Sequence, residues 1–173
     1  MTGSPASSDI ADCLNAQTES AARESLLRSC GSERWVAEML ALRPYPSDRS
    51  LLESAERIWW SLDPKDWLEA AAQHPRIGER APTGSSTEAW AQQEQSGMAE
   101  ASSDLTQELA NLNHVYEEKF GFVFLICATG LSAEAMLGAI RGRIDNMADD
   151  ELTHLATEKA KILRLRLQKL VRE

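Results

Sequence analysis

Helix caps recur along this chain, and they constrain its fold more than any other feature. The caps are Thr18, Ser32, Asp63 followed by Pro64, Ser102 or Ser103, and Ser132. Each is a residue type that closes a helix N-terminus, and proline suits the first helical turn. The apolar residues between the caps recur at steps of three and four, as one face of a helix requires. The pattern predicts an all-α chain.

The chain length predicts one domain over residues 1–173. At 173 residues, the chain can bury about 70% of its unfolded surface around one core. We expect a bundle of about eight to ten packed helices with no significant sheet, and a flexible lead-in over residues 1–7. Trp35, Trp59, Trp60 and Trp67 are expected to pack in the core or at interfaces.

One apolar stretch, FVFLICATG at 122–130, does not fit the helical pattern. It is β-prone, but the chain offers it no partner strand. We interpret it as a buried extended segment or an irregular helix. The backbone N–H and C=O groups of an extended segment need partners, and a flat polar ligand could supply them.

A histidine is fixed in place by the proline that follows it. Pro75 disfavours helical geometry at His74, so the preceding helix should end near Gln73 and leave His74 extended at the start of a loop. A second helix, from near Ser86, is expected beyond this loop. Its shared face would carry Trp90, Ala91, Glu94 and Met98. The carboxylate of Glu94 then either pairs with His74 across the loop or braces the loop itself.

The last helix, expected from about Asp149 to Arg172, carries an arginine on its apolar stripe. Leu155, Ile162, Leu163, Arg166 and Leu170 fall on this stripe. A guanidinium cannot lose its charge, so a buried one requires an anion. Arg166 therefore either pairs with an acid on a neighbouring helix or binds an anionic ligand.

Charge argues against nucleic acid and membrane partners. The net charge is −9, which repels phosphate. The basic cluster near the C-terminus is explained by the helix dipole, which favours cations there. This cluster comprises Lys159, Lys161, Arg164, Arg166, Lys169 and Arg172.

No cofactor motif is present, and the ligands for a metal are too few. His74 and Glu94 supply two ligands, while His114 and His154 lack the spacing of a metal-binding pair. The three cysteines, an odd number in a chain of this size, favour a reduced compartment. With no signal peptide at the N-terminus and no apolar run long enough to span a membrane, we expect a cytoplasmic protein.

Five motifs in order resemble one enzyme family. They are CGSERWVAEMLALRPYPS, DWLEAAAQHPRIGE, EQSGM, LNHVYEEKFGFVFLICATG and KILRLRLQKL. Over about residues 10 to 172 the chain resembles 2-oxo-4-hydroxy-4-carboxy-5-ureidoimidazoline (OHCU) decarboxylase. The resemblance implies an all-α homodimer that acts without metal or organic cofactor. It also implies the last step from urate to allantoin, in which OHCU yields (S)-allantoin and carbon dioxide.

The resemblance also assigns site residues by motif position. It implies that His74 and Glu94 are catalytic together with Arg166. It further implies substrate contacts, which fall on Pro75, Ala91, Gln95, Phe124, Leu125, Ile126, Cys127 and Ala128. Many members have serine where this chain has Ala91, so a water, Gln95, or the hydroxyl of Ser85 or Ser86 would have to replace that contact.

Two other functions remain open from the residues themselves. A helical interaction module would explain the amphipathic helices, but it leaves the pre-proline histidine, the core-face glutamate and the core-face arginine without a role. A metal-dependent hydrolase of a purine-derived ring would need a third ligand from His114, His154 or an acid.

Overall fold

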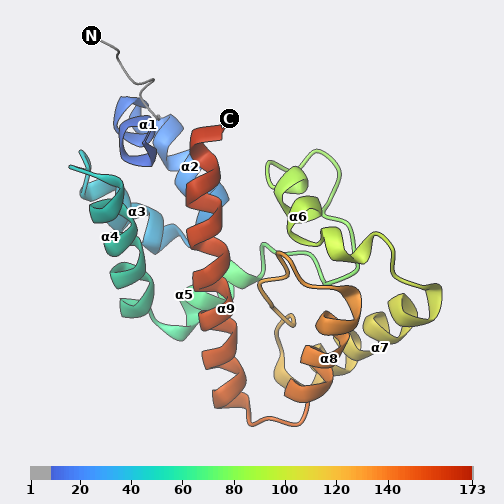
Figure 1. Cartoon of the computed structure of the whole chain (residues 1–173). Helices are drawn as coiled ribbons and strands as arrows, with labels where there is room; N and C mark the ends of the chain where they lie inside the picture. The colour runs from blue at the N-terminus through green and yellow to red at the C-terminus, as the bar shows by residue number, and fades with distance from the viewer. Residues whose placement is uncertain (1–8, 173) are drawn as a thin grey trace. The chain divides into compact units, whose positions relative to one another are not determined.

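The computed structural model describes residues 9–172, and its regular structure is helical (Figure 1). These residues form nine α-helices and two short 3₁₀ helices and include no strand. The prediction of an all-α chain of eight to ten helices is confirmed. The lead-in predicted for residues 1–7 lies outside the described residues.

The chain divides into two compact units. The first comprises Met1–Leu62 and Leu163–Glu173, and the second comprises Asp63–Ile162. The long helix α9 (Ala148–Lys169) contributes residues to both. His74, Glu94 and the 122–128 segment belong to the second unit, whereas Arg166 belongs to the first.

The first unit is built from capped helices that pack in sequence order. Its elements are α1 (Ile10–Ala16), α2 (Glu19–Cys30), α3 (Glu33–Ala41), α4 (Asp48–Ser61), the end of α9 and η2 (Leu170–Arg172). The hydroxyl oxygens of Thr18 and Ser32 accept backbone N–H groups at the starts of α2 and α3, as predicted. Gly31 ends α2 in the left-handed conformation, at φ 87°.

Aromatic side chains fill the core of the first unit. Trp35 and Trp59 are fully buried, and the indole N–H of Trp35 donates to the carbonyl of Ala55 at 3.0 Å. The Tyr45 hydroxyl donates to Met39, and burial raises the pKa of Tyr45 to about 12. Trp60 is 43% exposed, so it does not join Trp35 and Trp59 in this core.

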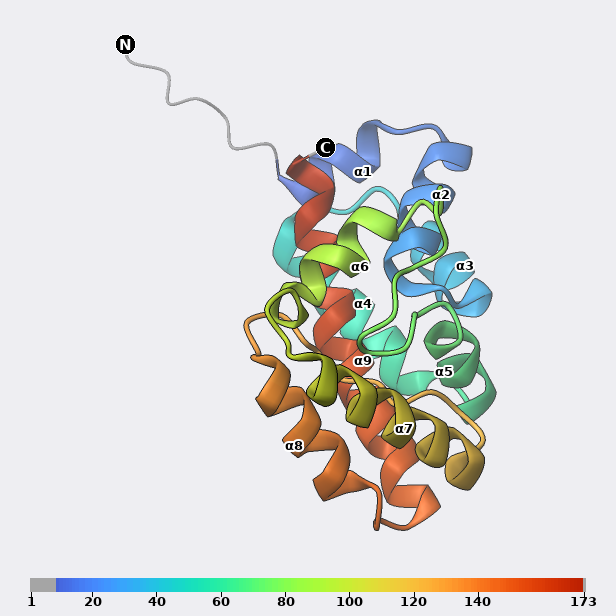
Figure 2. The same ribbon diagram turned by 90° about the vertical axis from the view of Figure 1, so that its right-hand side faces the viewer.

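The second unit begins with a short helix and ends on α9. Its other elements are α5 (Pro64–Ala71), α6 (Glu88–Glu94), η1 (Ser96–Met98), α7 (Ser103–Phe120) and α8 (Ala133–Arg143). Ser102 and Ser132 cap α7 and α8 as predicted, and α7 packs against α8 (Figure 2). Gly121, at φ 78°, ends α7 directly before the extended segment.

Helix α6 is shorter than the sequence predicts. Two turns, in which Ser85 N–H donates to Pro82 and Glu88 N–H donates to Ser85, delay its start to Glu88. It ends at Glu94, so Met98 lies on η1 and does not continue the face of Trp90, Ala91 and Glu94. The predicted single face from 90 to 98 is therefore wrong at its last position.

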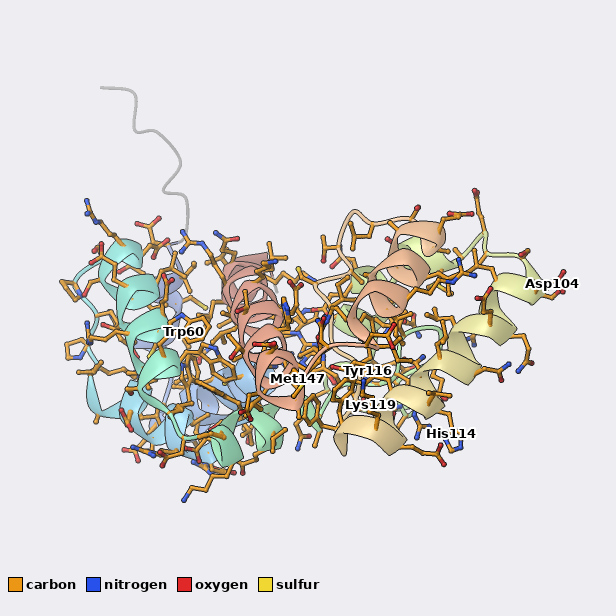
Figure 3. The ribbon with its side chains drawn as sticks, turned by 90° about the horizontal axis from the view of Figure 1, so that it is seen from below. Trp60, Asp104, His114, Tyr116, Lys119 and Met147 are labelled. Carbon is orange, nitrogen blue, oxygen red and sulfur yellow. The ribbon has the colours of Figure 1, made fainter. Side chains whose placement is uncertain are left out.

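Residues 122–128 are neither helix nor strand, and Phe124, Leu125 and Ala128 are buried, which favours the extended segment over the irregular helix. A buried ionic network supports this segment. The Arg143 guanidinium donates to the Leu125 carbonyl at 2.8 Å and lies over the Phe124 ring at 4.6 Å. The same guanidinium pairs with the carboxylate of Glu151, which also accepts from the hydroxyl of Tyr116, labelled in Figure 3.

The Glu151 carboxylate is fully buried, so its charge must be compensated. Burial by itself raises its pKa, but hydrogen bonds from Arg143, Tyr116 and Asn146 outweigh this and lower the pKa below the ordinary value. A lowered carboxylate pKa contributes stability above the ordinary titration range, and that contribution is lost as the pH falls through the lowered value.

We predict that Glu151→Gln lowers the free energy of unfolding by about 3–5 kcal/mol, because Arg143 is left as an uncompensated buried charge. The variant should also lose less stability than the unmodified protein on acidification. Urea unfolding followed by circular dichroism at several pH values measures both. Glu118→Gln, at an exposed pair with His114, is the control and should change stability by about 0.5 kcal/mol or less. Equal effects of the two substitutions would contradict the role of Glu151.

Candidate active site

His74 lies three residues after the end of α5, in a loop that packs against the extended segment. The helix ends at Ala71, slightly earlier than predicted, and the N–H of His74 donates to the Ala71 carbonyl at 3.0 Å. Ala71 packs with Leu125, and Ile77 packs with Phe124 and Ala128. Residues on both sides of His74 therefore contact the segment, and His74 itself is 9% exposed.

The loop after His74 is held by side chains from α6 and α7. Asn113 Nδ2 donates to the Ile77 carbonyl at 2.9 Å. The N–H of Gly78 donates to Gln95 Oε1 at 2.9 Å, and Gln95 Nε2 donates to the Arg76 carbonyl. Gln95 thus makes the loop-bracing contacts that sequence reasoning considered for Glu94.

Glu94 is buried at the end of α6, next to a tight backbone contact. A Cβ atom at Gly97 would lie 1.9 Å from the Leu131 carbonyl oxygen, so only glycine fits there. This contact joins η1 to the turn that follows the extended segment. Burial raises the pKa of the Cys127 thiol, and the negative charges of Glu158 and Glu94 raise it further.

The extended segment has some of its backbone groups bonded by the protein. Besides Leu125, the N–H of Cys127 donates to Glu158 Oε2 at 2.8 Å, and the Ala128 carbonyl accepts from Leu131 N–H at 2.9 Å. Within residues 9–172, the N–H and C=O of Ile126 make no hydrogen bond. The polar edge that could meet a flat ligand is therefore centred on Ile126.

The thiol of Cys127 is not suited to act as a nucleophile. Burial is the largest influence and raises its pKa, and the carboxylates of Glu158 and Glu94 raise it further. A thiol with a raised pKa stays protonated near neutral pH, whereas the thiolate is the reactive form. Cys127 therefore contributes packing and backbone groups to this region.

Sequence reasoning misplaced one residue of this region. Lys159 was grouped with the basic residues explained by the helix dipole, yet it is fully buried, and its Nζ lies 2.7 Å from His74 Nε2. The signal was in the spacing, because Lys159 lies four residues after Leu155 and three before Ile162 on the buried stripe of α9. The same spacing had identified Arg166.

Arg166 lies on the core-facing stripe of α9, as predicted. Its side chain is 2% exposed, and Nη1 donates to the Arg28 carbonyl at 3.3 Å within the first unit. Arg164 is exposed, also as predicted. Among the described residues, no group of three or more His, Cys, Asp or Glu side chains is arranged to hold a metal ion. None of the described helices is both long and apolar enough to cross a membrane.

The fold and these contacts define an all-α protein with a group of buried ionisable side chains beside an extended segment. A family model described as OHCU decarboxylase matches residues 15–168. A crystal structure described as OHCU decarboxylase in the presence of (S)-allantoin is 34% identical, with a TM-score of 0.73 over 87% of this chain and 99% of that one. The chain belongs to the OHCU decarboxylase family.

Curated relatives include single-function and bifunctional proteins. The uric acid degradation bifunctional protein TTL of Arabidopsis thaliana is 36% identical over 146 residues, which is 82% of this chain and 44% of that protein. The 2-oxo-4-hydroxy-4-carboxy-5-ureidoimidazoline decarboxylase of Haloferax volcanii is 28% identical over 77% of this chain and 79% of its own length. The chain therefore spans less than half of the plant relative.

We predict that Gly97→Ala destabilises the protein by about 1–3 kcal/mol, because the added methyl group must displace the Leu131 backbone or η1. Gly138→Ala on α8 is the matched control, since a Cβ there meets nothing within 4 Å and alanine favours a helix. The control should be neutral or stabilising by up to about 1 kcal/mol. Thermal and urea unfolding measure both, and an equally tolerated Gly97→Ala would show that the contact is not tight.

Proposed function

We propose that this chain decarboxylates OHCU to (S)-allantoin and carbon dioxide, the last step from urate to allantoin. Membership of the family supports the reaction, and the similarity to a uric acid degradation protein supports urate degradation as its setting. The observation that carries the proposal is the burial of His74 and Glu94 on elements that both contact the 122–131 region.

The substrate itself supplies the electron sink for the reaction. Loss of carbon dioxide leaves electrons on a ring carbon, and the adjacent C=N and carbonyl groups of the imidazoline accept them. The protein then has to orient the ring, compensate charge and deliver a proton. These are tasks for imidazole, carboxylate, guanidinium and backbone groups.

Each proposed catalytic residue has one task. His74 transfers the proton on one face of the ring, which makes a single enantiomer of allantoin. Glu94 braces the reacting groups through its buried charge, and Arg166 binds an anionic or carbonyl edge of the substrate. The family's motif positions assign these roles, and the burial of all three side chains supports them.

The proposed substrate contacts lie on the extended segment, in the His74 loop and on α6 and its C-cap. The backbone of Phe124, Leu125, Ile126, Cys127 and Ala128 lines the ring plane, with the N–H and C=O of Ile126 as its hydrogen-bonding groups. Pro75 and Ala91 supply apolar contact. The side-chain NH₂ of Gln95 has two hydrogens, and its hydrogen bond to the loop uses one of them. The other can donate to the substrate.

Ser85 is our candidate to replace the hydroxyl that Ala91 lacks. Its Oγ is buried and makes no hydrogen bond within the described part of the chain, whereas Ser86 is exposed. A buried hydroxyl without a partner is costly, and a polar substrate atom would relieve that cost.

We also propose a homodimer in a reduced, cytoplasmic compartment. The resemblance implies the dimer, and the three cysteines are free, which agrees with a reducing environment. Light scattering coupled to size exclusion should give a mass about twice 19.1 kDa. A monomer at micromolar concentration would contradict the dimer.

The activity is tested by generating OHCU from urate in situ and recording the circular dichroism of the allantoin formed. Spontaneous decay gives the racemate, so we expect the (S) product only with this protein. His74→Gln and Glu94→Gln should each slow its formation by about 10²–10⁴-fold, since a positioned acid or base contributes on that scale.

His114→Gln is the matched control for His74. This histidine lies on the exposed surface of α7 (Figure 3), where it pairs with Glu118. The control should retain full activity, and all variants should keep the helical circular dichroism signal. Turnover at the unmodified rate in His74→Gln would contradict the assignment of His74.

A further inference from the structure

A lysine is buried beside the histidine proposed for proton transfer. Lys159 lies on α9 between Leu155 and Ile162. Both of these residues pack with Leu125 of the extended segment. Its exposed fraction is 0%. An ammonium group removed from water is costly unless hydrogen bonds and nearby charge compensate it, so its position requires an explanation.

The contact between the two nitrogens determines how many protons they carry. At 2.7 Å, Lys159 Nζ and His74 Nε2 must share one hydrogen bond, so one nitrogen donates and the other accepts. Two protonated groups would place two donors and two like charges face to face. The pair therefore holds one excess proton at most.

That proton belongs on the lysine in the resting state. In water an amine binds a proton about four orders of magnitude more tightly than an imidazole does. Lys159 is then the donor, and the lone pair of His74 Nε2 is the acceptor. The neutral imidazole then carries its own proton on Nδ1, the ring nitrogen that is not bonded to Lys159.

Other ionisable groups lie on the elements around the pair. By element they are Asp66 on α5, Arg76 and Glu79 in the His74 loop, Glu94 on α6, Cys127 in the segment, Arg143 on α8, and Glu151 and Glu158 on α9. Several of them pair with other described residues. The carboxylate of Asp66 accepts a hydrogen bond from the Asp63 N–H. The carboxylate of Glu158 accepts one from the Cys127 N–H and pairs with Lys161.

The carboxylate of Glu94 is an anion that can balance the lysine. Arg76 pairs with Glu79 and with Glu117 on α7, and Arg143 pairs with Glu151. The Cys127 thiol is neutral. The buried carboxylate of Glu94 helps to raise the pKa of this thiol. Leu155 and Ile162, which flank Lys159 on α9, pack with Leu125 of the same segment.

We infer that Lys159 is a positioning residue that fixes the tautomer of His74 and supplies the proton His74 delivers. The inference rests on the proposed function. Decarboxylation of a carboxylate consumes one proton per turnover, and the pair stores one. His74 Nδ1–H gives its proton to the ring carbon as the C–CO₂ bond breaks. Nε2 takes a proton from Lys159, which becomes a neutral amine until solvent restores it.

The first test is the protonation state of His74, read by ¹H–¹⁵N NMR of its ring nitrogens. In the unmodified protein we expect Nδ1 protonated and Nε2 acting as an acceptor, with no titration across about pH 6–8. In Lys159→Met the ring should titrate near its ordinary value of about 6.5 and lose its fixed tautomer. Lys65→Met, at an exposed position of α5, is the control and should change neither. A protonated Nε2 in the unmodified protein would overturn the inference.

The second test is the pH dependence of turnover. Without Lys159 the acid must be the charged imidazole, so kcat of Lys159→Met should fall about tenfold for each pH unit above about 6.5, while KM changes little. The unmodified protein and Lys65→Met should stay active to higher pH. Identical pH profiles in all three proteins would overturn the inference while leaving the proposed function intact.

The two tests also separate the inference from the function. If the NMR result is as expected but the unmodified protein forms no (S)-allantoin, the proposed function fails and the tautomer assignment stands. Methionine has the volume and apolar character of a buried lysine stem, so Lys159→Met should fold. If it does not fold, the ¹⁵N signals of the His74 ring in the unmodified protein still test the tautomer. Lys159→Arg then tests the proton supply, because arginine can donate a hydrogen bond to His74 but cannot release a proton, so this variant should keep the tautomer and lose turnover.

Discussion

An extended segment inside a helical protein has no neighbouring strand to satisfy its backbone, and the second unit is arranged around this constraint. The Leu125 carbonyl accepts a hydrogen bond from Arg143, and the Cys127 N–H donates one to the carboxylate of Glu158. Both side chains come from elements that follow the segment in the chain. The protein thus uses charged side chains where a sheet would use another backbone, and the N–H and C=O of Ile126 have no partner among the described residues. Structural support and the proposed chemistry share one stretch of chain.

Most helices could be predicted because their start signals are local. A serine or threonine and the next few residues determine a cap, and a glycine that adopts positive φ determines an end, as at Gly31 and Gly121. The errors occurred where distant contacts decide. Helix α6 stops before Met98 because η1 must approach the Leu131 carbonyl, and nothing near Gly97 in the sequence identifies that partner.

The site was predictable in part for the same reason. Proline at 75 and helical spacing were enough to single out His74, Glu94 and Arg166 as unusual, and burial of each agrees with that. Lys159 was missed because it stands in a run of cations, where the simplest explanation is solvent exposure. The partners of Glu151 could not be predicted either. Tyr116 comes from α7, whereas Arg143 and Asn146 come from the end of α8 and the turn after it, and only the folded backbone brings these two places together.

The bond from Cys127 to Glu158 has a consequence for the motions of the segment. An amide outside any helix normally exchanges its hydrogen with solvent within minutes, yet this one is tied to a carboxylate on α9. Its exchange requires the segment to separate from α9, so its isotope uptake reports the opening of this side of the second unit. The neighbouring amide of Ile126 has no acceptor among the described residues, so its uptake would report the binding of the proposed substrate.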